Sequence, residues 1–409
     1  MSITEYKPHS NIRKYPSFGE QRRGLRRYGT KTGKRNVGLG AKVVNVYPGD
    51  DLQKMINGLN KDGGGIMFFN AGTYIIKTAL TGISAIQFIG ENTSTVILDF
   101  SSTSANLTFT GTSAYTTGTI TSITSGVSVT GSGTLWLANL TTDHQFFIAN
   151  RWYKIAAITS DTTLILSEGY AGGATFPGAA YRAVKIKQDI EFKEMTLKSS
   201  TGTAIDLDDC RNVTFDGVQF ISNNKGVTAD NCSELLFDET LIVSSTSNGL
   251  ELNTCGFTNA NSLSTPSNGG HGVVFNNFRI GSFYACSSDA NTSDGYNITS
   301  TSILQLNCEA SSNGGQGIEL VSGNTGIIIS NTVTESNTSD GIKLTATSDD
   351  VIITNSFINS NGGYGVNIAA STCDNNLIIG SKFASNVTAA YTNSGTGTLI
   401  RSNIGAADN

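Results

Sequence analysis

The sequence has few charged residues, little proline and no long apolar run. Of its 409 residues only five are Pro and 14% are charged, and no apolar stretch approaches the ~18 residues of a membrane span. The N-terminus lacks the apolar core of a signal peptide, so routine secretion is not encoded there. In contrast, the 46 Gly residues and the many Ser, Thr and Asn of the second half are typical of an all-β protein with tight turns.

Metal-binding motifs are also missing. The sequence contains no Cys-x-x-Cys pair, and its three His residues stand apart from one another. We therefore expect no zinc site, no other metal and no cofactor. The six cysteines are Cys210, Cys232, Cys255, Cys286, Cys308 and Cys373.

Charge is distributed unevenly along the chain. Residues 1–44 carry a net charge of about +9, and the remainder carries about −14, which together give the formal net charge of −5. A basic arm on an acidic body is suited to docking on an acidic partner surface. The alternative is that the arm is a solvated tail. Protein is favoured over nucleic acid as its partner, because aromatic residues that stack on bases are not interleaved with the basic ones in the manner of RNA-binding segments. The candidate docking residues are Arg13, Lys14, Arg22, Arg23, Arg26 and Arg27.

A tetrad of the form Gly-apolar-x-apolar repeats through the second half. Successive copies lie 22 to 24 residues apart, and each is followed by two further short apolar segments such as Val351-Ile-Ile and Phe357-Ile. Repetition at one period indicates a solenoid, in which stacked units bury an apolar face that one unit cannot bury alone. The tetrads begin at Ala204, Gly226, Gly249, Gly272, Gly295, Gly317, Gly341 and Gly365.

Three short strands per repeat predict one turn, or rung, of a right-handed parallel β-helix. Leucine-rich repeats share the period, but the helix-forming half of that motif is absent. Rungs stack at about 4.8 Å, so equivalent positions form columns along the molecule. Cys210, Cys232 and Cys255 recur at this period and are interpreted as a ladder of buried side chains rather than disulfide partners.

Residues 45 to 100 fit the entrance to the same solenoid. Pro48-Gly-Asp-Asp precedes a short amphipathic helix predicted at about 51 to 60, and a Gly-rich segment, a strand and Gly72-Thr-Tyr follow. This arrangement resembles the start of the pectate-lyase-like β-helix superfamily, where a helix caps the first rung. The resemblance covers about residues 43–112 and 185–405 and implies the fold.

An insertion of roughly residues 113–184 alternates apolar and polar residues without the rung period, which predicts a small antiparallel β-module. Its segments Val129-Thr-Gly-Ser-Gly-Thr-Leu-Trp136 and Ile158-Thr-Ser-Asp-Thr-Thr-Leu164 resemble a module of bacteriophage tail-fibre and tailspike proteins. The resemblance implies a homotrimeric virion protein, exposed on the particle. We therefore divide the chain into a virion-anchoring arm (1–44), a capping helix with first rungs (45–112), the insertion (113–184) and the main β-helix with its C-terminal cap (185–409).

Outward-facing residues of the repeated strand supply the candidate chemistry. The second and fourth positions after each tetrad Gly face solvent, because side chains alternate along a strand. Asp206, Asp208, Asp230 and Glu251 then gather on neighbouring rungs of one face. Asp208 and Asp230 should lie one rung apart, close to the carboxylate separation of a retaining glycosidase, and their repulsion would raise one pKa. Solvated surface acids or a cation site are the alternatives.

Accessory residues are proposed from the neighbouring columns. His271 and Asp294 stand one rung apart and could share acid–base work, and Arg211 follows Asp208 closely enough for the arginine role that the lyase resemblance implies. Asp294 also occupies a Thr-Ser-Asp-Gly turn, where we expect Asp to bond its own backbone. Asn253 and Tyr364 are the candidate carbohydrate-binding residues.

Three functions remain open at this stage. The favoured one is a trimeric tailspike or fibre that binds a host-surface polysaccharide, with cleavage if the carboxylates are active. A structural virion protein, such as a capsid decoration, head fibre or tail component, is the alternative. A free polysaccharide lyase or hydrolase ranks third because no signal peptide is encoded.

Overall fold

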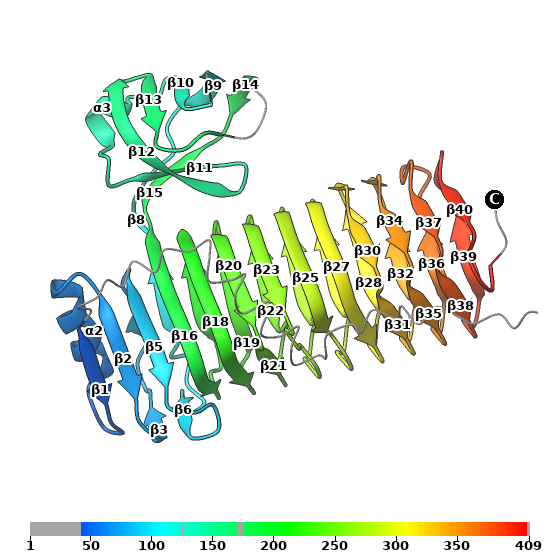
Figure 1. Cartoon of the computed structure of the whole chain (residues 1–409), viewed down its shortest axis with the longest axis horizontal. Coiled ribbons are helices and arrows are strands. Elements are labelled where there is room, and N and C mark those ends of the chain that lie inside the picture. The colour runs from blue at the N-terminus through cyan, green and yellow to red at the C-terminus, as the bar shows by residue number, and fades with distance from the viewer. Residues whose placement is uncertain (1–41, 125, 171–174, 407–409) are drawn as a thin grey trace, which may run out of the picture. The chain divides into compact units, whose positions relative to one another are not determined.

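A computed structural model describes residues 42–124, 126–170 and 175–406 of the chain. The predicted docking residues of the basic arm, Arg13 to Arg27, lie outside the described residues. Within them, the chain winds as a parallel β-helix with one antiparallel insertion and little helix (Figure 1). The predicted all-β fold class is therefore confirmed for the part of the chain that the structure describes.

Two sets of parallel ladders form the β-helix. The larger set, sheet A, bends around two sides of each rung, and the smaller set, sheet B, forms the third side. Sheet A comprises β1 (Val43–Val46), β2 (Gly65–Phe69), β3 (Gly72–Ile75), β5 (Ile86–Gly90), β6 (Val96–Asp99), β16 (Lys187–Lys198), β18 (Cys210–Ile221), β20 (Ser233–Asp238), β21 (Leu241–Val243), β23 (Gly256–Asn261), β25 (Arg279–Ser287), β27 (Ser302–Ser311), β29 (Asn324–Thr325), β30 (Ile328–Ser330), β31 (Val333–Glu335), β33 (Ser348–Asp349), β34 (Ile352–Thr354), β35 (Phe357–Asn359), β37 (Leu377–Ile379), β38 (Lys382–Ala384) and β40 (Leu399–Arg401). Sheet B comprises β4 (Leu80–Thr81), β7 (Leu107–Thr110), β17 (Thr203–Asp208), β19 (Lys225–Asp230), β22 (Leu250–Asn253), β24 (Val273–Asn276), β26 (Tyr296–Thr299), β28 (Ile318–Ser322), β32 (Ile342–Leu344), β36 (Tyr364–Ile368) and β39 (Ala389–Asn393).

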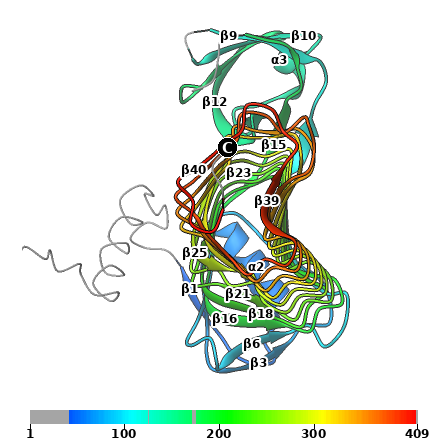
Figure 2. The same ribbon diagram turned by 90° about the vertical axis from the view of Figure 1, so that its right-hand side faces the viewer.

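A single rung shows how the corners are made. Strands β19, β20 and β21 follow one another, and the chain turns between them at Asn231 (φ 52°) and Glu239 (φ 48°). One residue in the left-handed region redirects the backbone sharply, and Asn is among the non-glycine residues that tolerate that region best. Viewed along the axis, successive rungs superpose, so each corner lies above the corner before it (Figure 2).

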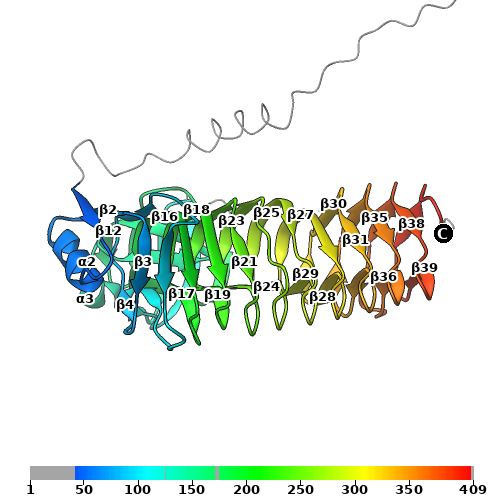
Figure 3. The same ribbon diagram turned by 90° about the horizontal axis from the view of Figure 1, so that it is seen from below.

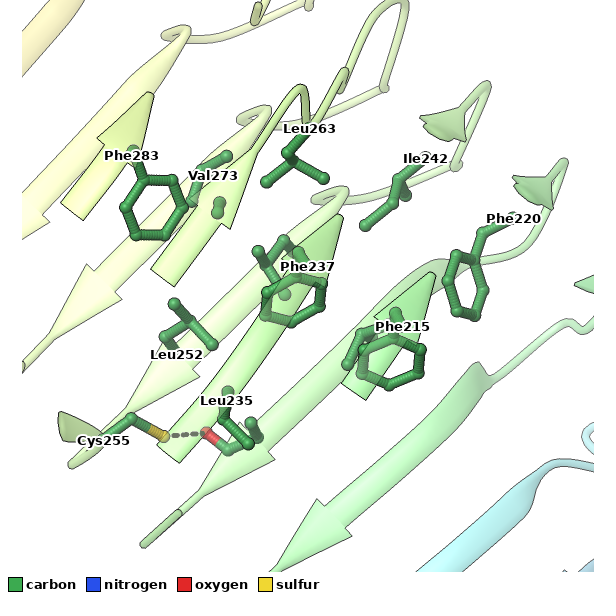
Figure 4. Packing of buried hydrophobic residues seen from close by; sticks show 14 of the residues in the cluster. Phe215, Phe220, Leu235, Phe237, Ile242, Leu252, Cys255, Leu263, Val273 and Phe283 are labelled. Carbon is green, nitrogen blue, oxygen red and sulfur yellow. Dashed lines mark hydrogen bonds between the residues drawn. The ribbon is translucent and has the colours of Figure 1, made fainter. Parts of the chain in front are cut away.

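The core follows the predicted alternation. The first and third residues after each tetrad Gly are buried, for example Leu250 and Leu252 on β22 or Ile342 and Leu344 on β32. Phenylalanine rings from neighbouring rungs stack inside, with 4.9 to 5.2 Å between consecutive ring centroids. Figure 4 shows this packing around Phe215 and Phe237. The four stacked rings are those of Phe88, Phe192, Phe215 and Phe237.

Cysteine and asparagine side chains form further internal columns. All six cysteines are buried and free, so the predicted ladder without disulfides is confirmed. At another corner, each side-chain amide donates to the amide oxygen of the next rung at 2.9 to 3.0 Å, which satisfies polar groups that burial would otherwise leave unpaired. This column consists of Asn268, Asn291, Asn313, Asn337, Asn361 and Asn386.

The capping helix lies where the sequence predicts it. Helix α2 spans Leu52–Lys61, and the Asp51 side chain accepts a hydrogen bond from the Lys54 backbone N–H at 3.0 Å. This N-cap satisfies one of the free backbone donors of the first turn. Leu52, Ile56 and Leu59 are buried against the first rungs.

The insertion is an eight-stranded antiparallel sheet between β7 and β16, with a core of its own. A short helix α3 (Trp136–Asn139) buries the Trp136 ring in that core. Neither helix of the described segments has the length and apolar character to cross a membrane. The strands are β8 (Thr112–Tyr115), β9 (Thr119–Thr124), β10 (Ser128–Ser132), β11 (Gln145–Ile148), β12 (Arg151–Ser160), β13 (Thr163–Leu166), β14 (Thr175–Ala179) and β15 (Arg182–Lys185).

The insertion is fastened to the corners that follow sheet B. Arg182 forms two hydrogen bonds of 2.6 Å with Asp209, a carboxylate that is only 1% exposed. The buried Trp152 donates its indole N–H to the Asn231 carbonyl at 2.7 Å, and the Asn150 side chain donates to the Cys255 carbonyl at 3.3 Å. Because these contacts fall on successive rungs, they hold the insertion beside the end of the candidate acidic column.

Candidate functional site

The candidate site lies on the outer face of sheet B, whose strands follow one another along one long edge of the β-helix (Figure 3). Asp208 on β17 is directly opposite Asp230 on β19, which is opposite Asn253 on β22. In the parallel column, Asp206 is opposite Thr228 and Thr228 is opposite Glu251. The structure therefore brings the four predicted carboxylates onto adjacent rungs of one face.

Asp208 and Asp230 form a stacked pair of carboxylates without a cationic partner. Among the described residues, Asp208 accepts a hydrogen bond from Asn231 at 3.3 Å, and neither acid forms an ion pair. The pKa of Asp230 is raised, mainly by burial and further by the charges of Asp208, Asp206 and Glu251, while the Asn253 side chain opposes the shift. Folding thus shifts the balance at Asp230 toward the protonated form relative to the unfolded chain.

The other two acids of the cluster are held in structural contacts. Asp206 accepts a hydrogen bond from the Thr228 hydroxyl at 2.8 Å. Glu251 forms an ion pair with Lys225 at 2.8 Å and accepts from the Asn248 amide at 2.7 Å. These contacts leave Asp208 and Asp230 as the pair best suited to proton transfer.

His271 and Asp294 meet as predicted, with 3.2 Å between Nδ1 of His271 and a carboxylate oxygen of Asp294. Burial alone would raise the pKa of Asp294, but hydrogen bonds from His271, Asn297 and the Gln316 backbone N–H lower it overall. The expectation that this turn Asp bonds its own backbone is wrong. Its carboxylate instead accepts the Gln316 N–H of the next rung at 2.8 Å, because stacked rungs bring that donor closer.

Arg211 is bound away from the acidic column. Its guanidinium contacts Glu234 at 3.0 Å and Glu168 of the insertion at 3.4 Å, and it donates to Gln145 at 3.4 Å. Burial lowers the pKa of Arg211, but the bonds to Glu234 and Glu168 outweigh it and raise the value overall. A guanidinium held in its charged form does not abstract a proton, so the arrangement gives no support to a lyase-like role.

The two candidate carbohydrate-binding residues differ in position. Asn253 continues the Asp208–Asp230 column by one rung and hydrogen-bonds the Asp230 side chain. Tyr364 lies five rungs further along the face, where its backbone N–H donates to Asp340 at 2.7 Å and its side chain is half-buried. Asn253 therefore lies beside the acid pair, whereas Tyr364 does not.

Sequence reasoning missed the ion pair of Asp209 and Arg182. Asp209 adopts the left-handed corner conformation (φ 56°) directly after Asp208. Burial raises its pKa, Arg182 opposes that shift, and the charge of Asp208 adds to it. The run Asp208-Asp-Cys marks the acids in the sequence, but no spacing points to an arginine of the insertion as the partner.

Other site types find no support in the described ranges. No group of three or more His, Cys, Asp or Glu side chains there converges closely enough to hold a metal ion. A hollow of about 460 Å³ lies at the capping helix, where its lining includes Val44, Met55 and Leu59 and none of the four acids of the candidate site.

Comparison with known proteins agrees with this fold. Residues 248–404 match the model of the right handed beta helix region. The A-module of the mannuronan C-5 epimerase AlgE4 from Azotobacter vinelandii has 14% sequence identity and a TM-score of 0.56, covering 85% of this chain and 94% of that one. The tailspike protein gp49 from Pseudomonas phage LKA1 has 13% identity and a TM-score of 0.54, covering 85% and 73%.

A third similar structure is the gp54 tailspike of Acinetobacter baumannii bacteriophage AP22, in complex with A. baumannii capsular saccharide. It has 12% identity and a TM-score of 0.40, covering 85% of this chain and 71% of that one. A search of curated proteins found no match. The likeness to the AlgE4 A-module and to LKA1 gp49 establishes the fold alone, a β-helix found both in a phage tailspike and in an epimerase.

The opposite pKa shifts of Asp230 and Asp294 predict opposite effects of neutralisation. Stability from the raised Asp230 carboxyl is present in full below its ordinary pKa of 3.8 and is lost as pH rises through the folded value. Asp230→Asn should therefore be more stable than wild type at neutral pH, by on the order of 1 kcal/mol, as for stacked like charges. The difference in the free energy of unfolding should shrink as the pH is lowered and the wild-type carboxyl is protonated. The measurement is urea unfolding followed by circular dichroism at several pH values.

Asp294→Asn is the matched control with the reverse sign. The lowered pKa of Asp294 stabilises the fold above 3.8, and this contribution disappears as pH falls through the folded value. The variant should be less stable than wild type at neutral pH and should approach it only in strong acid. Parallel pH profiles for the two variants would contradict the assignment.

Proposed function

We propose that this chain is a bacteriophage virion protein of the tailspike or fibre type, which binds a host-surface polysaccharide and hydrolyses it at Asp208 and Asp230. The observation that carries the proposal is the in-register pair of carboxylates without a cationic partner, one of them with a raised pKa. The fold shared with the tailspike of phage LKA1 and with an enzyme acting on mannuronan supports a polysaccharide ligand.

The geometry suits a retaining glycoside hydrolase. Neighbouring strands lie about 4.8 Å apart, and retaining enzymes hold their two carboxyl groups about 5 to 5.5 Å apart. Asp230, the carboxyl of the pair whose pKa is raised, would donate a proton to the leaving-group oxygen. Asp208 would attack the anomeric carbon, and Asp230 would then deprotonate the water that releases the sugar.

A non-enzymatic virion component is the second candidate, such as a capsid decoration, head fibre or tail component. The structural bonds of Asp206, Glu251 and Asp294 favour it, because each ties neighbouring rungs together or neutralises a charge. A free polysaccharide lyase gains no support from Arg211, whose ion pairs lie with Glu234 and Glu168.

The decisive test is cleavage of bacterial polysaccharide. Purified protein is incubated with capsular and lipopolysaccharide O-chains from a panel of bacteria, and chain length is measured by gel electrophoresis and mass spectrometry. Wild type should shorten one of them, and Asp208→Asn with Asp230→Asn should abolish the cleavage, since acid–base catalysis alone contributes about 10² to 10⁴-fold.

Asp216 and Asp238 provide a matched control for this experiment. They are also opposite one another, on β18 and β20 of sheet A, but Lys193 is bound to Asp216. Asp216→Asn with Asp238→Asn should cleave like wild type. An equal loss of cleavage in both double variants would contradict the assignment of Asp208 and Asp230 as the catalytic pair. If wild type cleaves no polysaccharide of the panel, the non-enzymatic candidate is favoured.

A homotrimer forms the second part of the proposal. The first residues of β30, β34, β37 and β40 form an outward apolar column on four successive rungs, and the exposed fraction is 37% for Ile328 and 43% for Leu399. These strands lie side by side in Figure 1. A continuous apolar stripe on a soluble surface favours association, and we assign it to the contact between copies, through Ile328, Ile352, Leu377 and Leu399.

Light scattering after size-exclusion chromatography tests this interface. The wild-type chain of 43.0 kDa should have the mass of a trimer, and Ile352→Lys with Leu377→Lys should reduce it to that of a monomer. Thr299→Lys, on the outer face of sheet B, should leave the trimer intact. If Ile352→Lys with Leu377→Lys leaves the mass at that of a trimer, this column is not the interface.

We also propose that residues 1–44 anchor the protein to other virion proteins, because the basic arm complements an acidic surface. Deletion of residues 1–41, which leaves β1 intact, should abolish co-sedimentation with phage particles. Replacing Arg13, Lys14, Arg22, Arg23, Arg26 and Arg27 by Gln should weaken attachment and reduce its sensitivity to salt. Normal assembly of the truncated protein on particles would refute the anchor.

A further inference from the structure

A second polar surface lies on the outer face of sheet A, around Tyr284. The Tyr284 side chain is 51% exposed on β25 and is directly opposite Asn261 of β23 and Asn307 of β27. The adjoining column places Ser282 between Asn259 and Gln305. One exposed aromatic ring is thus bordered by amide side chains on the rungs on both sides.

The amides around Tyr284 are largely free to bind. Within the part of the chain that the structure describes, the side chains of Asn259, Gln305 and Asn307 have no hydrogen-bond partner. Asn261 alone is engaged, donating to Asp238 at 2.9 Å. Elsewhere in the β-helix stacked amides satisfy one another, so this group of open donors and acceptors differs from the buried asparagine column.

The chemistry of the Tyr284 surface fits an uncharged sugar. A tyrosine ring offers a flat apolar face with a polar hydroxyl at its tip, and each amide supplies two donors and an acceptor for sugar hydroxyl groups. None of the residues Asn259, Asn261, Ser282, Tyr284, Gln305 and Asn307 is charged. A nucleic acid would require basic residues for its phosphates, and a protein interface would be expected to have a more apolar centre.

We infer that the surface formed by Asn259, Asn261, Ser282, Tyr284, Gln305 and Asn307, the Tyr284 surface, binds a neutral glycan and is separate from the acid pair on sheet B. Stacking on Tyr284 would fix one sugar unit, and the amides on the neighbouring rungs would hold the units before and after it. The surface ends where the apolar column begins, because Gln305 is opposite Ile328. This binding does not require that the protein cleaves any polymer.

Isothermal titration of the full-length protein tests the inference. The probes are hexasaccharides of glucose, galactose and N-acetylglucosamine, neutral O-chain fragments, and an alginate hexasaccharide as the anionic comparison. At least one neutral probe should bind, and Tyr284→Ala should weaken its binding at least tenfold. Tyr284→Phe should retain most of the affinity, because the ring face is preserved, and Gln305→Ala with Asn307→Ala should weaken it severalfold.

Two matched controls separate binding at the Tyr284 surface from binding elsewhere on the protein. Tyr47 is another exposed tyrosine (56%), on the N-terminal side of the capping helix, and Tyr47→Ala should bind like wild type. Asp208→Asn with Asp230→Asn is titrated in parallel, so that binding lost with the acid pair is distinguished from binding lost with Tyr284, and failure of the catalytic proposal from failure of this one. Each variant should keep the wild-type circular dichroism spectrum and melting temperature.

Three results would overturn the inference. The first is that no neutral probe binds, and the second is that Tyr284→Ala binds a neutral probe as tightly as wild type. The third is a preference for the alginate hexasaccharide, which would contradict the uncharged character of the Tyr284 surface.

Discussion

The parallel stacking of rungs in register is the constraint on which the structure depends. Each strand hydrogen-bonds the equivalent strand one repeat away, so a residue type chosen for one rung recurs directly above itself. Inward positions are then apolar on most rungs, and residues that tolerate the left-handed region recur at the corners. Polar side chains at inner corners are satisfied by their own counterparts, as in the column from Asn268 to Asn386.

The same register creates an electrostatic problem wherever acids recur on the outside. Several of these acids have a basic neighbour, since Glu251 is paired with Lys225, Glu319 with Lys343 and Asp216 with Lys193. Asp208 and Asp230 lack such a neighbour among the described residues, and burial adds to the repulsion at Asp230. A stack of like charges left uncompensated opposes stability, and carboxyl groups with shifted pKa values are concentrated at functional sites.

The insertion provides a fixed support beside this pair. Its contacts with the β-helix are a buried ion pair at Asp209, the Trp152 indole at Asn231 and an ionic network around Arg211, each on a different corner or rung. Arg182 hydrogen-bonds Asp209 and not Asp208, although the two acids are adjacent in sequence, and the charge of Asp208 also acts on Arg182. The insertion therefore holds the strand end in place through Asp209, while Asp208 forms no ion pair among the described residues.

The fold and the face of the candidate site can be predicted from the sequence alone. The repeat of 22 to 24 residues and the alternation after each tetrad Gly predict the rungs, the buried positions and the alignment of Asp208 with Asp230, because stacking converts periodicity directly into proximity. The partners of Asp209, Arg211 and Asp294, in contrast, depend on tertiary contacts. Asp209 and Arg211 bind residues of an insertion that has no periodic relation to the rungs. The Asp294 carboxylate accepts the Gln316 N–H of the next rung rather than a backbone N–H of its own turn, because of distances that only folding sets.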